Sequence, residues 1–280
     1  MGVIATMLIG NKYKSLWEST AKASWLAYAK KNHIDVVVIE DLPPGYIDEK
    51  PFAWNKLLIG RHPALPKTGK IAWLDSDIII NHEIAENIFE HAETGKISLC
   101  EGNTLIRHPF FSRSHHHMGG GRDHNQLVHA IYRAHGISEN VPKFLANTGV
   151  FVFDENVKYI MESTYYKYKH PGGSQQQEQA WFSYEVIAND ALHVLDPKFN
   201  VLWYEYVEAV FGKILSMFPG LLPATIAQAI FNSYFLHFAG RHQDMIPLSS
   251  EVEFKDDRIV VSEKFMELIK IFEVHYGAAD

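Results

Sequence analysis

The chain has 280 residues, of which 47% are hydrophobic and 21% are charged, proportions that are typical of a folded globular protein and exclude a disordered one. Its formal net charge of −7 provides no broad basic surface, which excludes a nucleic-acid backbone as the main partner. A single cysteine, Cys100, allows no intrachain disulfide and is typical of a reducing compartment.

The N-terminal third of the chain alternates short apolar runs with segments of helical periodicity. Strands are expected at 3–9, 35–39, 71–74 and 78–80, and helices at 15–31, 54–60 and around 83–91. Three consecutive valines at 36–38 indicate a strand that is buried on both faces, as in a parallel sheet. This order predicts an α/β fold in which 78–80 continues the strand 71–74 after an acidic interruption.

The remaining residues continue this alternation without an internal repeat or a break in composition. Strands are expected at 97–100, 150–153, 192–195 and 234–238, and helices at 178–188 and 263–275. Three consecutive histidines, His115 to His117, and three glycines predict a loop at 102–124, and we expect its part 111–123 to close over a substrate. Two interpretations of the histidines stay open: a polar loop, and a separate metal site in a non-catalytic binding module.

No segment predicts a membrane-spanning helix, because charged, amide and proline residues interrupt the apolar stretch 207–238. The first residues lack the basic start and the cleavage site of a signal peptide. These features predict a cytoplasmic protein. A weak peripheral membrane contact stays open as an alternative to a core helix, through Phe211, Ile214, Leu215 and Phe218.

Two carboxylates, Asp75 and Asp77, interrupt the apolar run WLDSDIII. Burying them is unfavourable unless a cation or strong hydrogen bonds compensate their charge. Side chains two residues apart on an extended segment project to the same side, so both can face one ion while Ser76 points away. Hard oxygen ligands of this kind bind Mn²⁺ or Mg²⁺, which complete their shells with phosphate oxygens. The pair predicts a diphosphate-binding metal site, which glycosyltransferases, nucleotidyltransferases and phosphatases can all use.

Four motifs in chain order favour the first of these classes. The runs WNKLLIGRHPALPKTGKIAWLDSDIIIN, NTGVFVFD, QEQAWFSYEV and LHFAGRH resemble the retaining glycosyltransferases of the galactosyl-, mannosyl- and xylosyltransferase group, which includes yeast Golgi mannosyltransferases and plant xyloglucan xylosyltransferases. The resemblance spans residues 3–242 and implies the GT-A fold, an α/β fold with a mostly parallel, Rossmann-like sheet flanked by helices. We expect one domain, 1–280, with a nucleotide-binding half (1–100), a sugar-binding half (101–242) and a helical C-terminal extension (243–280).

The resemblance also implies which residues bind the metal and the donor. Asp75 and Asp77 match the Asp-x-Asp motif of the family, and His237 in LHFAG matches the histidine that completes the metal shell. The implied cofactors are Mn²⁺ or Mg²⁺ and a nucleotide sugar, with UDP as the expected nucleotide. Further donor contacts are implied for Thr6 and Tyr13 at the base, Lys56 at the diphosphate or sugar, Asp75 at the ribose, and Arg241 at the phosphates.

At the sugar, the resemblance implies roles for Asn147, Glu178 and Gln179. Asn147 in NTG matches a residue that lines the donor sugar, while Glu178 and Gln179 match the step beside the anomeric carbon. Gln177 replaces the first of two usual aspartates, so the side chain that contacts the sugar hydroxyls stays open.

The implied reaction transfers galactose, xylose, mannose or glucose to a glycan or glycoconjugate hydroxyl with retention, as in polysaccharide biosynthesis. Inversion with Glu178 as general base and a sugar nucleotidyltransferase are the alternatives.

Overall fold

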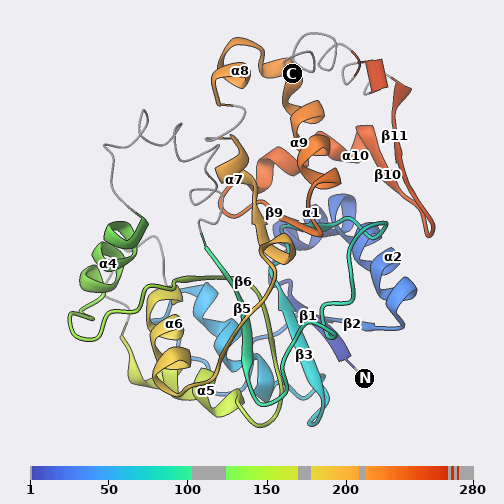
Figure 1. Cartoon of the computed structure of the whole chain (residues 1–280). Coiled ribbons are helices and arrows are strands. Elements are labelled where there is room, and N and C mark those ends of the chain that lie inside the picture. The colour runs from blue at the N-terminus through green and yellow to red at the C-terminus, as the bar shows by residue number, and fades with distance from the viewer. Residues whose placement is uncertain are drawn as a thin grey trace.

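The computed structural model describes residues 2–102, 124–169, 178–207 and 212–263, together with positions 266, 267 and 270. In this part of the chain, one large sheet forms the centre of the molecule, with helices on both of its faces (Figure 1). A smaller sheet and a hairpin lie beyond the end of the large sheet that carries the acidic motif.

The large sheet has six strands in the order β2-β1-β3-β6-β5-β7. Its strands are β1 (Gly2–Met7), β2 (Asp35–Ile39), β3 (Lys70–Leu74), β5 (Ile97–Glu101), β6 (Ala146–Phe153) and β7 (Leu192–Val194). β6 runs antiparallel to its neighbours β3 and β5, whereas the other three pairings are parallel. This arrangement confirms the predicted α/β fold with a mostly parallel central sheet.

The small sheet has three strands in the order β4-β9-β8. Its strands are β4 (Ile78–Ile80), β8 (Val201–Leu202) and β9 (Phe235–His237). The sequence predicted that β4 continues β3, and this prediction is wrong. β4 leaves the large sheet and pairs antiparallel with β9. The acidic motif between β3 and β4 is the point at which the chain crosses from one sheet to the other.

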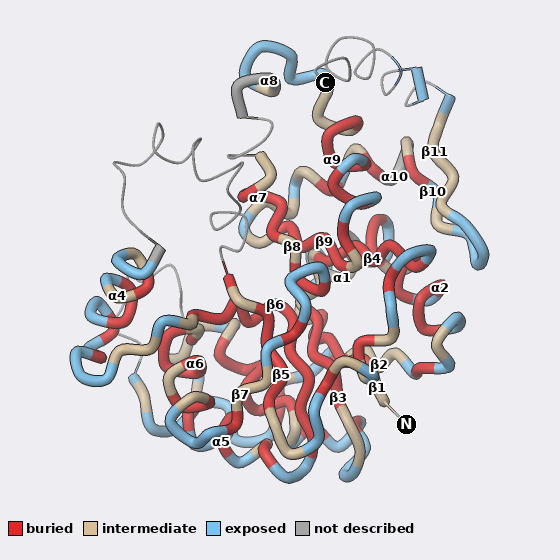
Figure 2. Tube along the Cα trace, viewed as in Figure 1, coloured by how far each residue is buried: buried red, intermediate tan, exposed pale blue. Residues whose placement is uncertain are grey.

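Two apolar cores cover the two faces of the large sheet (Figure 2). Consecutive residues of each central strand alternate between them, so that Ala72 belongs to one core and Trp73 to the other. The first core is built by the small sheet with α1 (Asn11–Thr20), α2 (Lys22–Asn32) and α9 (Leu222–Phe231), and the second by η1 (Phe52–Arg61), α4 (His124–Ala134), α5 (Lys158–Lys167) and α6 (Gln179–Ala188). Burial on both faces explains why these strands lack polar alternation.

Several predicted helices differ in the structure. A turn at Ala21 divides the expected helix 15–31 into α1 and α2, and the expected helix 54–60 is the 3₁₀ helix η1. The helix predicted around 83–91 is wrong, because this segment forms turns. There the Tyr28 hydroxyl donates to the Glu86 carbonyl at 2.8 Å and accepts from the Ile88 amide at 2.9 Å, so a long-range contact replaces helical bonds.

The C-terminal part contains more than the predicted helices. After β9 it forms η6 (His242–Met245), α10 (Leu248–Glu251) and an antiparallel hairpin of β10 (Val252–Phe254) and β11 (Ile259–Val261). This hairpin was not predicted from the sequence. Further short elements are η3 (Pro197–Asn200), α7 (Trp203–Tyr206), α8 (Gly212–Met217) and η5 (Pro219–Leu221).

Some predictions fall on residues that the structure does not describe. The loop 111–123 with His115 to His117, and Gln177 and Phe211, lie outside the described residues, as does most of the expected helix 263–275. Of the apolar side chains considered for membrane contact, Leu215 packs against the first core and Phe218 is 52% exposed. Among the described helices, none combines the length and the apolarity needed to cross a membrane.

We expect Tyr28→Phe to destabilise the fold, because the two backbone groups that its hydroxyl binds would lose their partner in a buried setting. Loss of such a partner costs about 1–3 kcal/mol in the free energy of unfolding, measurable by urea denaturation. Tyr159→Phe is the matched control, since Tyr159 is 57% exposed, and should change stability by less than about 0.5 kcal/mol. Equal stability of the two variants would contradict this anchoring role.

Candidate active site

The acidic motif is held by both sheets. The backbone amide of Asp75, directly after β3, donates to the carbonyl of Gly149 in β6 at 2.8 Å. The carbonyl of Asp77, directly before β4, accepts from the amide of Phe238 at 2.9 Å. Asp75 is thereby tied to the large sheet and Asp77 to the small one. The two carboxylates consequently occupy fixed places at the junction between the sheets.

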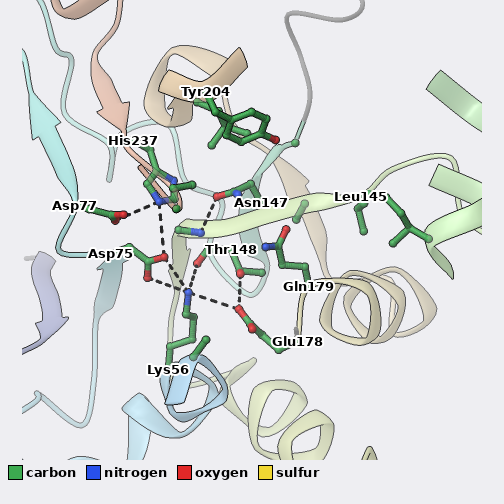
Figure 3. Close-up of a pocket in the computed structure, with 18 of the residues that line it drawn as sticks. Lys56, Asp75, Asp77, Leu145, Asn147, Thr148, Glu178, Gln179, Tyr204 and His237 are labelled. Atoms are coloured by element: carbon green, nitrogen blue, oxygen red, sulfur yellow. Dashed lines mark hydrogen bonds and ion pairs between the residues drawn. The ribbon is translucent and has the colours of Figure 1, made fainter. Parts of the chain in front are cut away.

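His237 lies beside this motif because Ile78 of β4 pairs with His237 of β9. Its Nε2 atom is 3.3 Å from Oδ1 of Asp77 and 3.8 Å from Oδ2 of Asp75 (Figure 3). One ligand atom from each of the three residues lies within 4.8 Å of the others. Two carboxylates and one imidazole around a single point form a ligand set that suits a divalent cation such as Mn²⁺.

The environment keeps Asp77 ionised. Burial acts to raise the pKa of its carboxyl group, but the charge of His237, a hydrogen bond from His237, and the more distant Lys56 together hold that pKa below its ordinary value. An ionised carboxylate is the form that binds a cation. The protonation state required for metal binding is therefore the one that the surrounding residues favour.

Lys56 of η1 lies beneath the motif with only 6% of its side chain exposed. Its ammonium donates to both oxygens of Asp75, at 2.9 and 3.1 Å, and to the carbonyl of Thr148 at 3.2 Å (Figure 3). A carboxylate oxygen of Glu178 lies 3.5 Å away. Burial acts to lower the pKa of Lys56, but the carboxylates of Asp75, Glu178 and Asp77 outweigh it and raise that pKa. The positively charged ammonium of Lys56 thus lies between the carboxylates of Asp75 and Glu178.

Asp75 receives a further hydrogen bond from the indole of Trp73, at 2.8 Å. Together with the bonds from Lys56, this contact fixes the plane of the Asp75 carboxylate. One of its oxygens, Oδ2, remains directed toward His237 at 3.8 Å. Asp75 is therefore oriented by Lys56 and by Trp73, of which Trp73 is itself packed in the second core.

Glu178 and Gln179 lie at the start of α6, facing the first residues of β6 (Figure 3). One oxygen of Glu178 accepts from the Thr148 hydroxyl at 2.5 Å, whereas the other is buried without a partner among the described residues. Asn147 accepts from the amide of Gly149 at 3.0 Å through its side-chain oxygen. These residues surround the same space as Lys56 and the acidic motif.

Two adjoining cavities meet at the acidic motif. The larger, about 850 Å³, is lined by Asn147, Glu178, Gln179 and Tyr204, among others. The smaller, about 440 Å³, is lined by Tyr13, Phe52 and His242, among others. Lys56, Asp75, Asp77 and Gly240 line both. A ligand that passes the candidate metal site can therefore occupy both cavities at once.

Two of the predicted donor residues line neither cavity. Thr6 is completely buried in β1, and its hydroxyl has no partner among the described residues. Arg241 lies at the start of η6, where its Nε atom is 3.6 Å from Asp244, and the neighbouring His242 lines the smaller cavity instead. The ring centroids of His242 and Tyr13 are 6.4 Å apart, so residues that are distant in the sequence lie close together at this cavity.

The roles of two residues of the site are not predicted by the sequence. Asn200, at the end of η3, accepts from Nδ1 of His237 at 2.9 Å, and nothing in its local sequence indicates this contact. The second is Gly149 of the NTG motif, where a glycine by itself indicates only that the backbone passes close to another group. A Cβ at this position would lie 2.1 Å from Cε1 of His237, so the close neighbour is a protein side chain.

We expect Gly149→Ala to displace the His237 ring and to weaken Mn²⁺ binding by at least about tenfold, as loss of a well-placed ligand does. Mn²⁺ titration followed by electron paramagnetic resonance measures the affinity directly. Gly220→Ala is the control, because no atom of the described residues lies within 4 Å of the position that its added methyl group would take. Unchanged Mn²⁺ affinity in Gly149→Ala would remove His237 from the metal site.

Comparison with known proteins bears on the fold. No protein-family model matches the chain, and no curated protein matches it significantly in sequence. The solved glycosyltransferase involved in glycosylation of the major capsid of PBCV-1 superposes with a TM-score of 0.53 at 14% identity, covering 88% of this chain and 98% of that chain. Galactosyltransferase LgtC, solved with donor and acceptor sugar analogues, gives 0.45 at 10% identity over 96% and 100% of the two chains, and mouse xyloside xylosyltransferase 1 gives 0.40 at 14% over 85% and 98%. The first superposition, together with the sheet order, confirms the prediction that this chain has the GT-A glycosyltransferase fold.

Proposed function

We propose that the chain is a metal-dependent glycosyltransferase. It transfers a hexose or pentose from a nucleoside-diphosphate sugar, with UDP as the expected nucleotide, to a hydroxyl group of a glycan or glycoconjugate. The observation that carries this proposal is the convergence of Asp75, Asp77 and His237 at the junction of two cavities. A diphosphate flanked by a nucleoside and a sugar needs such an arrangement, with a cation site in the middle and space on both sides.

The ligand set supports a divalent cation at this junction. Asp75, Asp77 and His237 would hold it, with Mn²⁺ preferred over Mg²⁺ because one of the donors is an imidazole. When bound, the cation supplies positive charge that stabilises the departing diphosphate. The absence of a Cβ at Gly149, which makes room for the imidazole, supports the same interpretation.

We assign the nucleoside to the smaller cavity and the sugar to the larger one. The smaller cavity is lined mainly by residues of the half 1–100, where Tyr13 and Phe52 are 48% exposed and offer aromatic faces to a base. His242 lines this cavity, so it joins Arg241 as a candidate for the phosphates. A direct contact of Thr6 with the base stays a prediction, and its complete burial favours a contribution through the backbone of β1.

Around the sugar, we assign binding roles to Asn147 and Gln179, both of which line the larger cavity, in the half 101–242. We propose that Lys56 acts as a fixed countercharge between Asp75 and Glu178, since its donors are engaged by protein oxygens. This role differs from the direct donor contact expected from the sequence resemblance. The positive charge offsets the repulsion between two acidic groups that lie a short distance apart in a buried site.

Retention of the anomeric configuration is the stereochemistry that we propose. In an inverting enzyme, Glu178 would have to remove a proton from the acceptor hydroxyl. The position of Glu178 disfavours this role, because one of its oxygens is bound to Thr148 and the other is enclosed. In the retaining reaction the departing phosphate oxygen can accept the proton, while Gln179 steadies the positive charge that develops at the anomeric carbon.

We expect Asp77→Asn to reduce hydrolysis of the preferred nucleotide sugar in the presence of Mn²⁺ by about 100-fold or more, since it removes a charged ligand at the point where the leaving group is stabilised. The wild type is first assayed against a panel of UDP and GDP sugars, with nucleoside diphosphate release as the readout. Asp190→Asn is the control, because the Asp190 side chain is fully exposed. Release of pyrophosphate by the wild type would identify a nucleotidyltransferase instead.

The first glycoside formed by the wild type should have the same anomeric configuration as the donor sugar. Proton NMR of the glycoside reads this configuration from the signal of its anomeric proton. Glu178→Gln should give the same anomer at a lower rate, because the amide alters the charge around Lys56 but not the stereochemical course. An inverted product would contradict retention and make Glu178 the leading candidate for the base.

A further inference from the structure

We infer that Asn200 is a positioning residue of the metal centre, which holds His237 in the one ring tautomer that can bind a cation together with Asp75 and Asp77. This inference rests on the proposed metal-dependent function. Asn200 is 1% exposed, lies at the end of η3 and lines neither of the two cavities. It therefore acts through the imidazole and not on the substrate.

The direction of each hydrogen bond in this network follows from a backbone group whose role is unambiguous. The amide of Gly149 can only donate, so the side-chain atom of Asn147 that it contacts at 3.0 Å is the oxygen. The side-chain atom of Asn200 that lies 2.9 Å from that oxygen must donate, and so is the amide nitrogen. The same nitrogen is 3.2 Å from the backbone carbonyl of Asn147, a second obligatory acceptor. Two independent contacts thus orient the Asn200 amide.

This orientation determines the proton position on His237. With its nitrogen engaged by Asn147, Asn200 presents its oxygen to Nδ1 of His237 at 2.9 Å. An oxygen acceptor requires a proton on Nδ1, which leaves Nε2 as the ring nitrogen with the free lone pair. Nε2 is the atom that faces Asp77 at 3.3 Å and Asp75 at 3.8 Å.

Without a metal, a proton on Nε2 can bridge the ring to Asp77, and a metal ion takes the place of that proton when it binds. Because Nδ1 already carries a proton toward Asn200, Nε2 is the ring nitrogen that presents a lone pair to such an ion. Backbone contacts add rigidity, because His237 lies in β9, where Leu202 of β8 and Ile78 of β4 are its neighbours. Gly149 closes the remaining side of the ring, since a Cβ there would lie 2.5 Å from Nδ1.

The same network fixes the orientation of the Asn147 side-chain amide. Its side-chain oxygen accepts from both Gly149 and Asn200, so its NH₂ group is the part left to face the larger cavity. Asn147 can therefore offer only donors to a ligand there, which suits oxygen acceptors such as sugar hydroxyls or phosphate oxygens. Asn200 in this way links the orientation of a metal ligand to that of a residue lining the sugar side.

The test is Mn²⁺ binding to the full-length protein without nucleotide, measured by electron paramagnetic resonance. Asn200→Ala should bind Mn²⁺ about 10–100-fold more weakly than the wild type, the usual effect of removing a partner that orients a metal ligand. Asn200→Asp keeps an oxygen acceptor for Nδ1 but loses the donor to Asn147, so it should bind Mn²⁺ more tightly than Asn200→Ala and more weakly than the wild type. Asn81→Ala is the structural control, because Asn81 is 1% exposed and binds a backbone carbonyl in the same way, but near the other end of β4.

Nitrogen-15 NMR of metal-free protein with labelled histidine gives a readout that a merely structural role would not change. The His237 signals, identified by their absence in His237→Gln, should show a protonated Nδ1 in the wild type and in Asn200→Asp, and a mixture of tautomers in Asn200→Ala. Wild-type Mn²⁺ affinity or an unchanged tautomer in Asn200→Ala would overturn the inference. Failure of the wild type to bind Mn²⁺ would overturn it together with the metal site, whereas Mn²⁺ binding without turnover of any nucleotide sugar would count against the proposed function alone.

Discussion

The site depends on one crossing of the chain from the large sheet to the small one. β3 ends in the large sheet and β4 begins in the small sheet, so the residues between them must span the junction. Asp75 is held by the backbone of β6 on one side, and Asp77 by the residue after β9 on the other. The arrangement of two carboxylates around a common point is therefore a consequence of how the two sheets meet. It does not require a flexible loop.

Concentrating acidic groups at this junction carries an electrostatic cost that the fold offsets with neighbouring charge and hydrogen bonds. Lys56 neutralises part of the charge from below, and Trp73 and Thr148 donate to the carboxylates of Asp75 and Glu178. Hydrogen bonds and a nearby positive charge offset the cost of burying carboxylates. Burial and countercharge together produce a site that is preorganised for a cation and for the diphosphate that the cation would hold.

The two cavities on either side of this site indicate how a nucleotide sugar would lie across it. Each has its own wall chemistry, aromatic in the smaller and amide- and carboxylate-rich in the larger, and both reach the acidic junction. The network from Gly149 through Asn147 and Asn200 to His237 connects the wall of the larger cavity to the metal ligands. A nucleotide sugar would therefore meet groups whose orientations are already set before it binds, which lowers the ordering cost of the reaction.

The sequence by itself determined the α/β class and the strands of the central sheet, because local periodicity predicts them. It also determined the acidic motif, because two charged residues stand out inside an apolar run. It also identified His237, but only through the resemblance of LHFAG to a family motif, since a lone strand-end histidine carries no such information. Tertiary structure alone decided that β4 joins a second sheet and that 83–91 forms turns around Tyr28. It also decided that the ammonium of Lys56 is hydrogen-bonded to Asp75. It likewise decided the role of Asn200, which is 37 residues from His237 along the chain and 2.9 Å from it in space. Local patterns report which face of an element is buried, whereas contacts between distant segments depend on how the elements pack, and those contacts orient the site.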